Sequence, residues 1–302
     1  MTTAASKQTA SSRIKRTSTV FTIFNVIIMA ILVLITIYPF YYVIVGSISG
    51  NNVGAQEVYF LYPVDLDFGA YNMVFSTTSI PRAYMNTVFV TVVGTTLSLL
   101  LTILTAYPLS KSRLRGRSFF TMLFYFTMLF SGGLIPTYLV IRDLGMIDSL
   151  WSLILPRLVS VYNMLLMINF FKSIPDGLEE SATIDGANDL TILVRIILPL
   201  SMPILATLTL FYAVSYWNIW FDAIMYLNSN RHFPLQLVLR DIVQSVDMTY
   251  VGGGGGDFTM SDTTIQSVRL ATIVVAILPI MMVYPFLQKY FVKGVMIGAI
   301  KG

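Results

Sequence analysis

The stretch Glu180-Ser181-Ala182-Thr183-Ile184-Asp185-Gly186 is polar, and it lies between two long apolar runs, residues 150–171 and 196–227. Ten residues after it comes Ile196-Ile197-Leu198-Pro199, which opens the second run. Only 11% of the residues of the chain are charged, so a polar segment of this length is unusual. We expect it to lie outside the lipid, where another molecule can contact it.

The apolar runs on either side indicate the fold class. Of the 302 residues, 56% are hydrophobic, and the mean hydropathy of +0.75 lies outside the range of soluble domains. Runs of about 20 apolar residues are long enough for a helix to cross a hydrocarbon core of about 30 Å. Backbone groups in lipid must be bonded internally, which predicts an all-α polytopic membrane protein. Six spans are predicted, at residues 20–46, 84–109, 118–141, 150–171, 196–227 and 270–291.

The composition excludes several kinds of site. The chain has no cysteine, so disulfides and cysteine-ligated metals are excluded. Its one histidine, His232, is expected to be an ordinary loop residue, and no catalytic residue or metal site is predicted. A membrane-embedded enzyme is an alternative that would need a catalytic constellation these residues do not supply. The net charge of +4 is interpreted as cytoplasmic anchoring charge rather than nucleic-acid binding.

The placement of Lys and Arg predicts the orientation, because cytoplasmic loops are enriched in both. With a cytoplasmic N-terminus, most of the 19 cations fall in inside segments, and the cluster Lys111, Arg113, Arg115 and Arg117 is the clearest example. Residues 1–19 and 293–302 are then cytoplasmic tails, and residues 172–195 form a cytoplasmic loop within the membrane domain 20–292. The five consecutive glycines at 252–256 are expected to be a linker in an outside loop. No internal repeat is evident, which disfavours an ion-coupled secondary transporter.

Residues 172–195 are predicted to form two short helices. Pro175 ends the fourth span near Ser173 and suits the first turn of a new helix. Gly186 stands where a left-handed residue would end that helix. Either Asn188 or Asp189 can cap the second helix. Such a hairpin either presents a docking surface or simply lies under the bilayer.

The spacing in this loop resembles a known motif. Glu180-Ser181-Ala182, three residues, Gly186, nine residues and then Ile196-x-Leu198-Pro199 is similar to the EAA loop of ABC-importer permeases, with Ser181 in place of the first alanine. Nearly the whole chain resembles the carbohydrate branch of the binding-protein-dependent transport inner-membrane component family, of the maltose-permease type. The stretches Phe130 to Tyr138, Tyr216 to Trp220 and Lys293 to Gly302 carry the wider resemblance. The first of them is most similar to the subgroup that imports complex or polysaccharide-derived sugars.

The resemblance implies a type I ABC importer permease fold and a transport function. The chain would carry an oligosaccharide across the cytoplasmic membrane of a prokaryote, as a non-enzymatic subunit that binds no cofactor. Its partners would be a second homologous permease, an extracytoplasmic solute-binding protein and two ATPase subunits that bind ATP and magnesium. The tail residues Lys301 and Gly302 would contact the ATPase. So would the coupling residues Glu179, Glu180, Ser181, Ala182, Ile184, Asp185, Gly186, Ala187 and Asn188. An importer of an amino acid or phosphate is the alternative within the family.

Polar and aromatic residues at membrane depth are candidates for the substrate pathway. They are Ser131, Tyr138, Tyr162, Asn163, Tyr216, Trp217 and Asn218. For the aromatic residues, packing or an interfacial belt is the competing interpretation. The glycines after Ser131 either kink the third span or permit close helix packing. Arg157 and Asp222 either pair between spans four and five or line the pathway.

Overall fold

The computed structural model describes residues 4–49, 62–63, 66–76, 79–244 and 267–282. Within these ranges the chain is helical apart from its connecting segments and one isolated antiparallel bridge between Ser49 and Leu66. The all-α prediction is confirmed. The chain divides into two compact units, Met1–Met73 with Phe258–Val274, and Val74–Asp257 with Val275–Gly302.

The first unit contains the long N-terminal helix. Helix α1 covers Ala4–Ser47, and its part Phe21–Ser47 is apolar over 27 residues, which is long enough to cross a membrane. Helix α2, Gly69–Ser76, begins where the Asp67 carboxylate accepts the backbone N–H of Gly69 at 2.8 Å. The hydroxyls of Ser47 and Tyr71 are 2.6 Å apart, so the end of α1 is bonded to α2.

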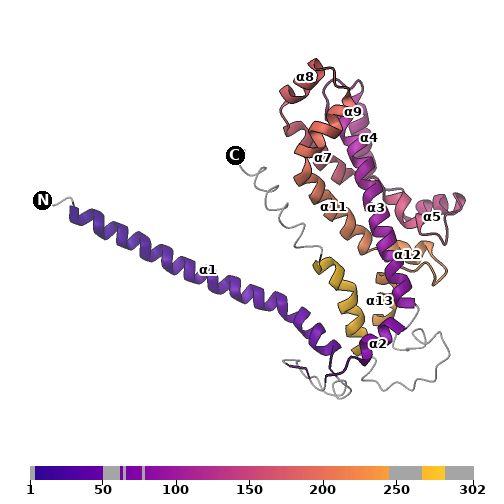
Figure 1. Cartoon of the computed structure of the whole chain (residues 1–302), viewed down its shortest axis with the longest axis horizontal. Helices are drawn as coiled ribbons and strands as arrows, with labels where there is room; N and C mark the ends of the chain where they lie inside the picture. The colour runs from indigo at the N-terminus through magenta and orange to yellow at the C-terminus, as the bar shows by residue number, and fades with distance from the viewer. Residues whose placement is uncertain (1–3, 50–61, 64–65, 77–78, 245–266, 283–302) are drawn as a thin grey trace. The chain divides into compact units, whose positions relative to one another are not determined.

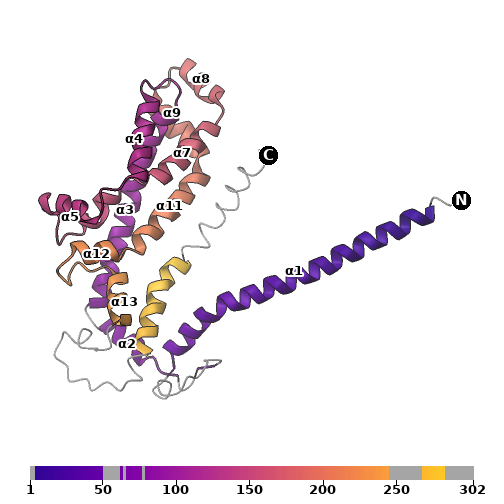
Figure 2. The ribbon, with the colours of Figure 1, turned by 180° about the vertical axis from the view of Figure 1, so that it is seen from behind.

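The second unit is built around α3, Ser79–Ser110, with α7 and α11 packed against it. Figures 1 and 2 show α8 and α9 at one end of this unit, and α12 and α13 towards the other. The elements that follow α3 are α4 Arg117–Leu129, α5 Leu134–Asp143, α6 Trp151–Ile154, η2 Leu155–Arg157, α7 Val161–Ser173, α8 Asp176–Ile184, α9 Asp189–Ile192, η3 Leu193–Ile197, α10 Leu198–Leu200, α11 Met202–Trp217, α12 Phe221–Tyr226 and α13 Leu235–Gln244.

A line of small residues on α3 receives two tyrosines of α11. Gly94, Ser98 and Thr102 are four residues apart, so they share one face of α3. The hydroxyl of Tyr216 is 2.9 Å from that of Ser98, and the hydroxyl of Tyr212 is 2.7 Å from that of Thr102. A Cβ at Gly94 would lie 2.8 Å from the Tyr216 ring, so only glycine fits there. These five residues form what we call the α3–α11 seam, a close helix contact of the small-residue type.

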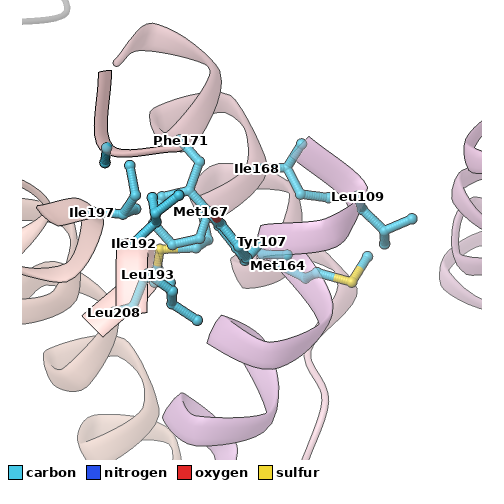
Figure 3. Packing of buried hydrophobic residues seen from close by; sticks show 12 residues of the cluster. Tyr107, Leu109, Met164, Met167, Ile168, Phe171, Ile192, Leu193, Ile197 and Leu208 are labelled. Carbon is cyan, nitrogen blue, oxygen red and sulfur yellow. The ribbon is translucent and has the colours of Figure 1, made fainter. Parts of the chain in front are cut away.

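Next to the seam, a buried apolar cluster supports α8 and α9. It joins α3, α7, α9, η3 and α11, and Figure 3 shows its side chains meeting between these helices. Met164 and Phe171 of α7 are buried, with exposed fractions of 0% and 1%. Ala182 of α8 and Ile192 of α9 belong to the same cluster. Each of the two short helices therefore has an anchor in the main body.

The third predicted span, 118–141, is not one straight helix. It is broken into α4 and α5, which meet at an angle of 110°. Gly133 has φ of +88° at the break, a conformation that glycine adopts far more easily than other residues. The 13 residues of α4 extend over about 20 Å, less than the hydrocarbon core. Of the two interpretations of the glycines after Ser131, the structure favours a kink over close helix packing.

The fifth predicted span, 196–227, is also interrupted. The helix bends by 83° between Asp189–Leu200 and Met202–Trp217, next to Pro199 and Pro203. It ends at Trp217, and the side-chain amide of the next residue, Asn218, donates to the carbonyl of Val214 at 2.8 Å. Helix α12 then starts separately.

By length and apolar composition, the described residues hold two helices able to cross a membrane, or five spans if each bent pair is one span. The third such pair, Trp151–Arg157 with Val161–Ser173, bends by 47°. A shorter apolar helix covers Ser267–Met282. The rest of the predicted sixth span, residues 283–291, lies outside the described residues.

Candidate functional site: the hairpin of α8 and α9

The α8–α9 hairpin, residues 175–192, begins as the sequence predicts. Helix α7 ends at Ser173 and Ile174 is extended, as expected of a residue before proline. Pro175 is the N-cap of α8, so the helix starts one residue later than a proline in its first turn would imply. Asp176 and Glu179 lie in the first turn, where acidic side chains complement the helix dipole.

The turn between the two helices also follows local rules. Gly186 has φ of +82°, and the N–H of Ala187 donates to the carbonyl of Ala182 at 2.9 Å. Of the two candidate caps for α9, Asn188 holds the position, since its side-chain oxygen accepts the N–H of Thr191 at 2.8 Å. The predicted two-helix shape is confirmed.

The tip of the hairpin is exposed and apolar at one point. Ile184 is 87% exposed, the highest exposed fraction of any large hydrophobic side chain in the described part of the chain. Ala182 points the other way, with 9% of its surface exposed, and packs against the core. A small residue at position 182 therefore serves packing against the body of this chain. The remaining exposed coupling candidates are Glu180, Ser181, Asp185, Gly186 and Asn188, while Glu179 and Ala187 are partly buried.

Two ion pairs join the hairpin to the loop after α3. Lys111 pairs with Glu179 of α8, and their side chains are only 13% and 14% exposed. Arg113 pairs with Asp189 of α9, and these side chains are 57% and 64% exposed. The Lys111 ammonium also lies 5.0 Å from the centre of the Tyr107 ring. The first pair is shielded from water and holds α8 in place, whereas the second is largely screened.

These ion pairs were not predicted from the sequence. Glu179 was assigned to an ATPase contact, and in the structure its carboxylate is engaged within the chain by Lys111. A signal was present, because the Lys111 to Arg117 cluster and the acidic hairpin were both placed on the cytoplasmic side. Opposite charges confined to one face can be expected to pair.

The pathway candidates fall into two groups. Ser131, Tyr162 and Asn218 are exposed, and Tyr138 is partly buried against Tyr226, with ring centroids 6.4 Å apart. The other three candidates are buried, and they are Asn163, Tyr216 and Trp217.

The side chains of two buried candidates bond within the chain, and the third candidate bonds there through its backbone. Tyr216 belongs to the α3–α11 seam, and the indole N–H of Trp217 donates to the carbonyl of Ala276 at 3.2 Å. The backbone N–H of Asn163 donates to the Ser160 hydroxyl that caps α7. In the described conformation these three side chains therefore have almost no surface left for a ligand.

Arg157 and Asp222 form the interhelical ion pair that the sequence allowed. An Arg157 Nη lies 2.8 Å from a carboxylate oxygen of Asp222, and the other Nη lies 3.2 Å from the Ser215 hydroxyl. The pair connects η2 to α12 and α11. Its side chains remain 40% and 25% exposed.

A second polar cluster, at the turn before α6, was missed. Asp148 has φ of +59°, and its carboxylate accepts the N–H groups of Asn228 at 3.0 Å and Ser229 at 2.8 Å. The bond from Ser229 is the main reason that the pKa of Asp148 is lowered, and His232, 3.2 Å away, adds to the effect. His232 lies in a loop, as expected, but it takes part in fastening that loop to Asp148.

The predicted contact of Lys301 and Gly302 with the ATPase lies outside the described residues. Across the ranges that the structure describes, no group of three or more His, Asp or Glu side chains is placed to hold a metal ion.

Known proteins resemble this chain over nearly its full length. Protein LplC of Bacillus subtilis (strain 168) is 45% identical over 94% of this chain and 95% of its own length. The polygalacturonan/rhamnogalacturonan transport system permease protein YtcP of the same organism is also 45% identical, over 89% of this chain and 94% of its own. A solved bacterial ABC transporter involved in import of the acidic polysaccharide alginate matches with a TM-score of 0.83 and 38% identity, over 91% of this chain and 98% of that one.

The chain belongs to the carbohydrate permeases of ABC importers. No model in a scan of protein families matches it. As an ABC permease it is an integral protein of a prokaryotic membrane, and it works with an ATPase and a solute-binding protein. The hydrolysis of ATP belongs to the partner subunits, so this permease is not itself an enzyme.

Proposed function

We propose that this permease carries an oligosaccharide derived from a polysaccharide across the cytoplasmic membrane, and that ATP hydrolysis on a partner drives it through the α8–α9 hairpin. The observation that carries the proposal is the hairpin itself, which has an exposed tip with Ile184 and a base packed into the apolar core. The substrate class is supported by the names of the relatives, which transport polygalacturonan or rhamnogalacturonan in one case and alginate in another.

The proposed assembly has two permeases and two ATPase subunits. In it, this chain crosses the membrane six times with both termini in the cytoplasm, and residues 1–19 and 293–302 are cytoplasmic tails. Two apolar helices long enough to cross a membrane, three bent pairs and Ser267–Met282 support the count of spans. The chain binds no cofactor, and ATP and magnesium bind to the ATPase. Lys301 and Gly302 reach the ATPase as well.

Force would pass from the hairpin into the membrane helices through three connections. Ala182 and Ile192 insert into the core formed with α3, α7 and α11. Glu179 is held by Lys111 at the end of α3. The α3–α11 seam then ties α3 to α11, so a displacement of the hairpin moves these helices together. A loosely attached loop would absorb the same displacement.

The pathway would be lined by the exposed candidates. Ser131, Tyr162 and Asn218 offer hydroxyl, aromatic and amide groups that suit a sugar. An exposed ion pair is costly against lipid, so Arg157 and Asp222 mark a face that water or the second permease covers. Tyr138, Asn163, Tyr216 and Trp217 would contact the sugar only in another conformation of the transport cycle.

Substitution of Gly186 by valine tests the coupling role. A β-branched residue at φ of +82° is strained, so the tip must change shape. We expect co-purification of the ATPase with the permease to fall about tenfold, and uptake of a polygalacturonate oligosaccharide into proteoliposomes to fall with it. Gly145→Val is the matched control, because Gly145 has φ of +69° in another exposed turn and no atom within 4 Å of an added Cβ, as at Gly186. Equal assembly and uptake in both variants would disprove the coupling role.

A further inference from the structure

A cavity of about 450 Å³ opens beside the hairpin, between the end of α3 and the start of α9 and η3. Its walls are largely apolar. Leu104 and Pro108 line it from α3, and Leu190 and Leu193 line it from α9 and η3. All four belong to the same compact unit. A water-filled apolar cavity of this size is unfavourable, so an apolar group is the expected occupant.

Three cations line the cavity, Lys111, Arg113 and Arg115, with Asp189 as the one carboxylate among its lining residues. Arg113 and Arg115 are exposed, and we call the part of the cavity that they line its mouth. Lys111 is neutralised by Glu179, and Arg113 shares its charge with Asp189. Arg115 is exposed and makes no ion pair with any residue in the described part of the chain. The mouth therefore keeps a positive charge that can attract an anion.

The cavity is continuous with a surface suited to lipid. Leu104, which lines the cavity, is 48% exposed, and Leu100, one turn earlier on α3, is 51% exposed. Both lie on a helix long and apolar enough to cross a membrane. Cations directly after such a helix lie at the depth of the lipid headgroups. A ligand there can place a charged group at the mouth and an apolar chain along α3.

We propose that this cavity binds an anionic phospholipid. The phosphate lies between Arg113 and Arg115, and an acyl chain runs past Leu104 towards Leu100. Basic pockets at the cytoplasmic end of membrane helices bind anionic headgroups in this way. None of the pathway candidates lines this cavity, so the proposal does not depend on which oligosaccharide the permease carries. Because Asp189 and Leu190 of the hairpin line the same cavity, the bound lipid would touch the coupling element.

The test is a lipid titration of the complete transporter in detergent, followed by native mass spectrometry. We expect dioleoylphosphatidylglycerol to bind in preference to dioleoylphosphatidylcholine. Arg113→Gln combined with Arg115→Gln should weaken phosphatidylglycerol binding roughly 30-fold, since each cation near a headgroup contributes about a factor of five. Leu190→Trp should weaken it too, because the ring fills the cavity without changing the charge. Arg142 is an exposed arginine of α5 that pairs with its neighbour Asp143, away from the cavity, so Arg142→Gln should bind the lipid like wild type.

Several results would overturn the proposal. Equal binding of the two lipids would show that the cations do not select an anionic headgroup. Wild-type binding by Leu190→Trp would show that the lipid does not occupy the cavity. If Arg142→Gln lost as much phosphatidylglycerol binding as the double variant, the lipid would be attracted by the overall positive charge and not by this site. Displacement of the lipid by inorganic phosphate at the same concentration would mean a site for free anions, and a protein segment found in place of lipid would mean a protein interface. If the double variant does not assemble, Arg115→Gln alone decides, because it breaks no described ion pair.

Discussion

The tip of the α8–α9 hairpin carries Ile184 with 87% of its surface exposed, whereas the α3–α11 seam holds Tyr216 with 1% exposed. Both were singled out from the sequence as functional residues. The shape of the hairpin depends on neighbours in the sequence, through Pro175, Gly186 and Asn188. The place of Tyr216 depends on Ser98, which is 118 residues away. A conformation that local backbone rules determine can be predicted before the fold is known. The position of a side chain that depends on tertiary packing cannot.

The largest effect is expected at the seam. Gly94→Ala puts a Cβ 2.8 Å from the Tyr216 ring, and the ring cannot retreat without losing its bond to Ser98. Overpacking of this kind should destabilise the protein by about 2–3 kcal/mol. The measurement is the midpoint of thermal unfolding of the purified permease. Gly132→Ala is the control, because its nearest atom is Cβ of Pro136 at 3.9 Å, and it should be close to neutral. Equal midpoints for the two variants would mean that the seam is looser than described.

A smaller effect is expected where the hairpin meets the body. Lys111→Gln leaves the carboxylate of Glu179 with little water and no ion pair, which should cost about 2 kcal/mol. Arg113→Gln breaks an exposed pair and should cost only about 0–1 kcal/mol. Thermal unfolding gives the stabilities, and the ratio of sugar transported to ATP hydrolysed reports the coupling. If Arg113→Gln were the more damaging of the two, burial of the Lys111 pair would not be what holds α8.

The smallest effect concerns the local rules of the hairpin. Asn188→Ala removes the cap of α9 and should cost about 1 kcal/mol, whereas Asn188→Asp keeps a side-chain oxygen and should cost less. The same unfolding measurement compares the two variants. An unchanged unfolding midpoint in Asn188→Ala would show that the cap contributes nothing and that packing of Ile192 positions α9.

Much of the fold was predictable because it follows from local signals. Apolar runs predicted the helices, and Pro175, Gly186 and a cap at either Asn188 or Asp189 predicted the hairpin. Hydropathy did not predict the 110° bend at Gly133 or the 83° bend near Ser201, although the glycines after Ser131 allowed a kink. Hydropathy measures transfer into lipid and carries no information on helix direction. The Lys111–Glu179 pair and the Asp148 cluster join distant segments, so composition alone could not locate them.

The docking of the hairpin tip on the ATPase is the central claim, and one cross-linking measurement tests it most directly. The chain has no cysteine, so Ile184→Cys creates a single attachment point for a thiol-reactive photo-cross-linker. Leu144→Cys, 66% exposed in the turn after α5, is the control position. In the complete transporter, with partner subunits freed of reactive cysteines, we predict a permease–ATPase product from position 184 and none from position 144. No product from position 184 in a complex that hydrolyses ATP and transports sugar would contradict the account.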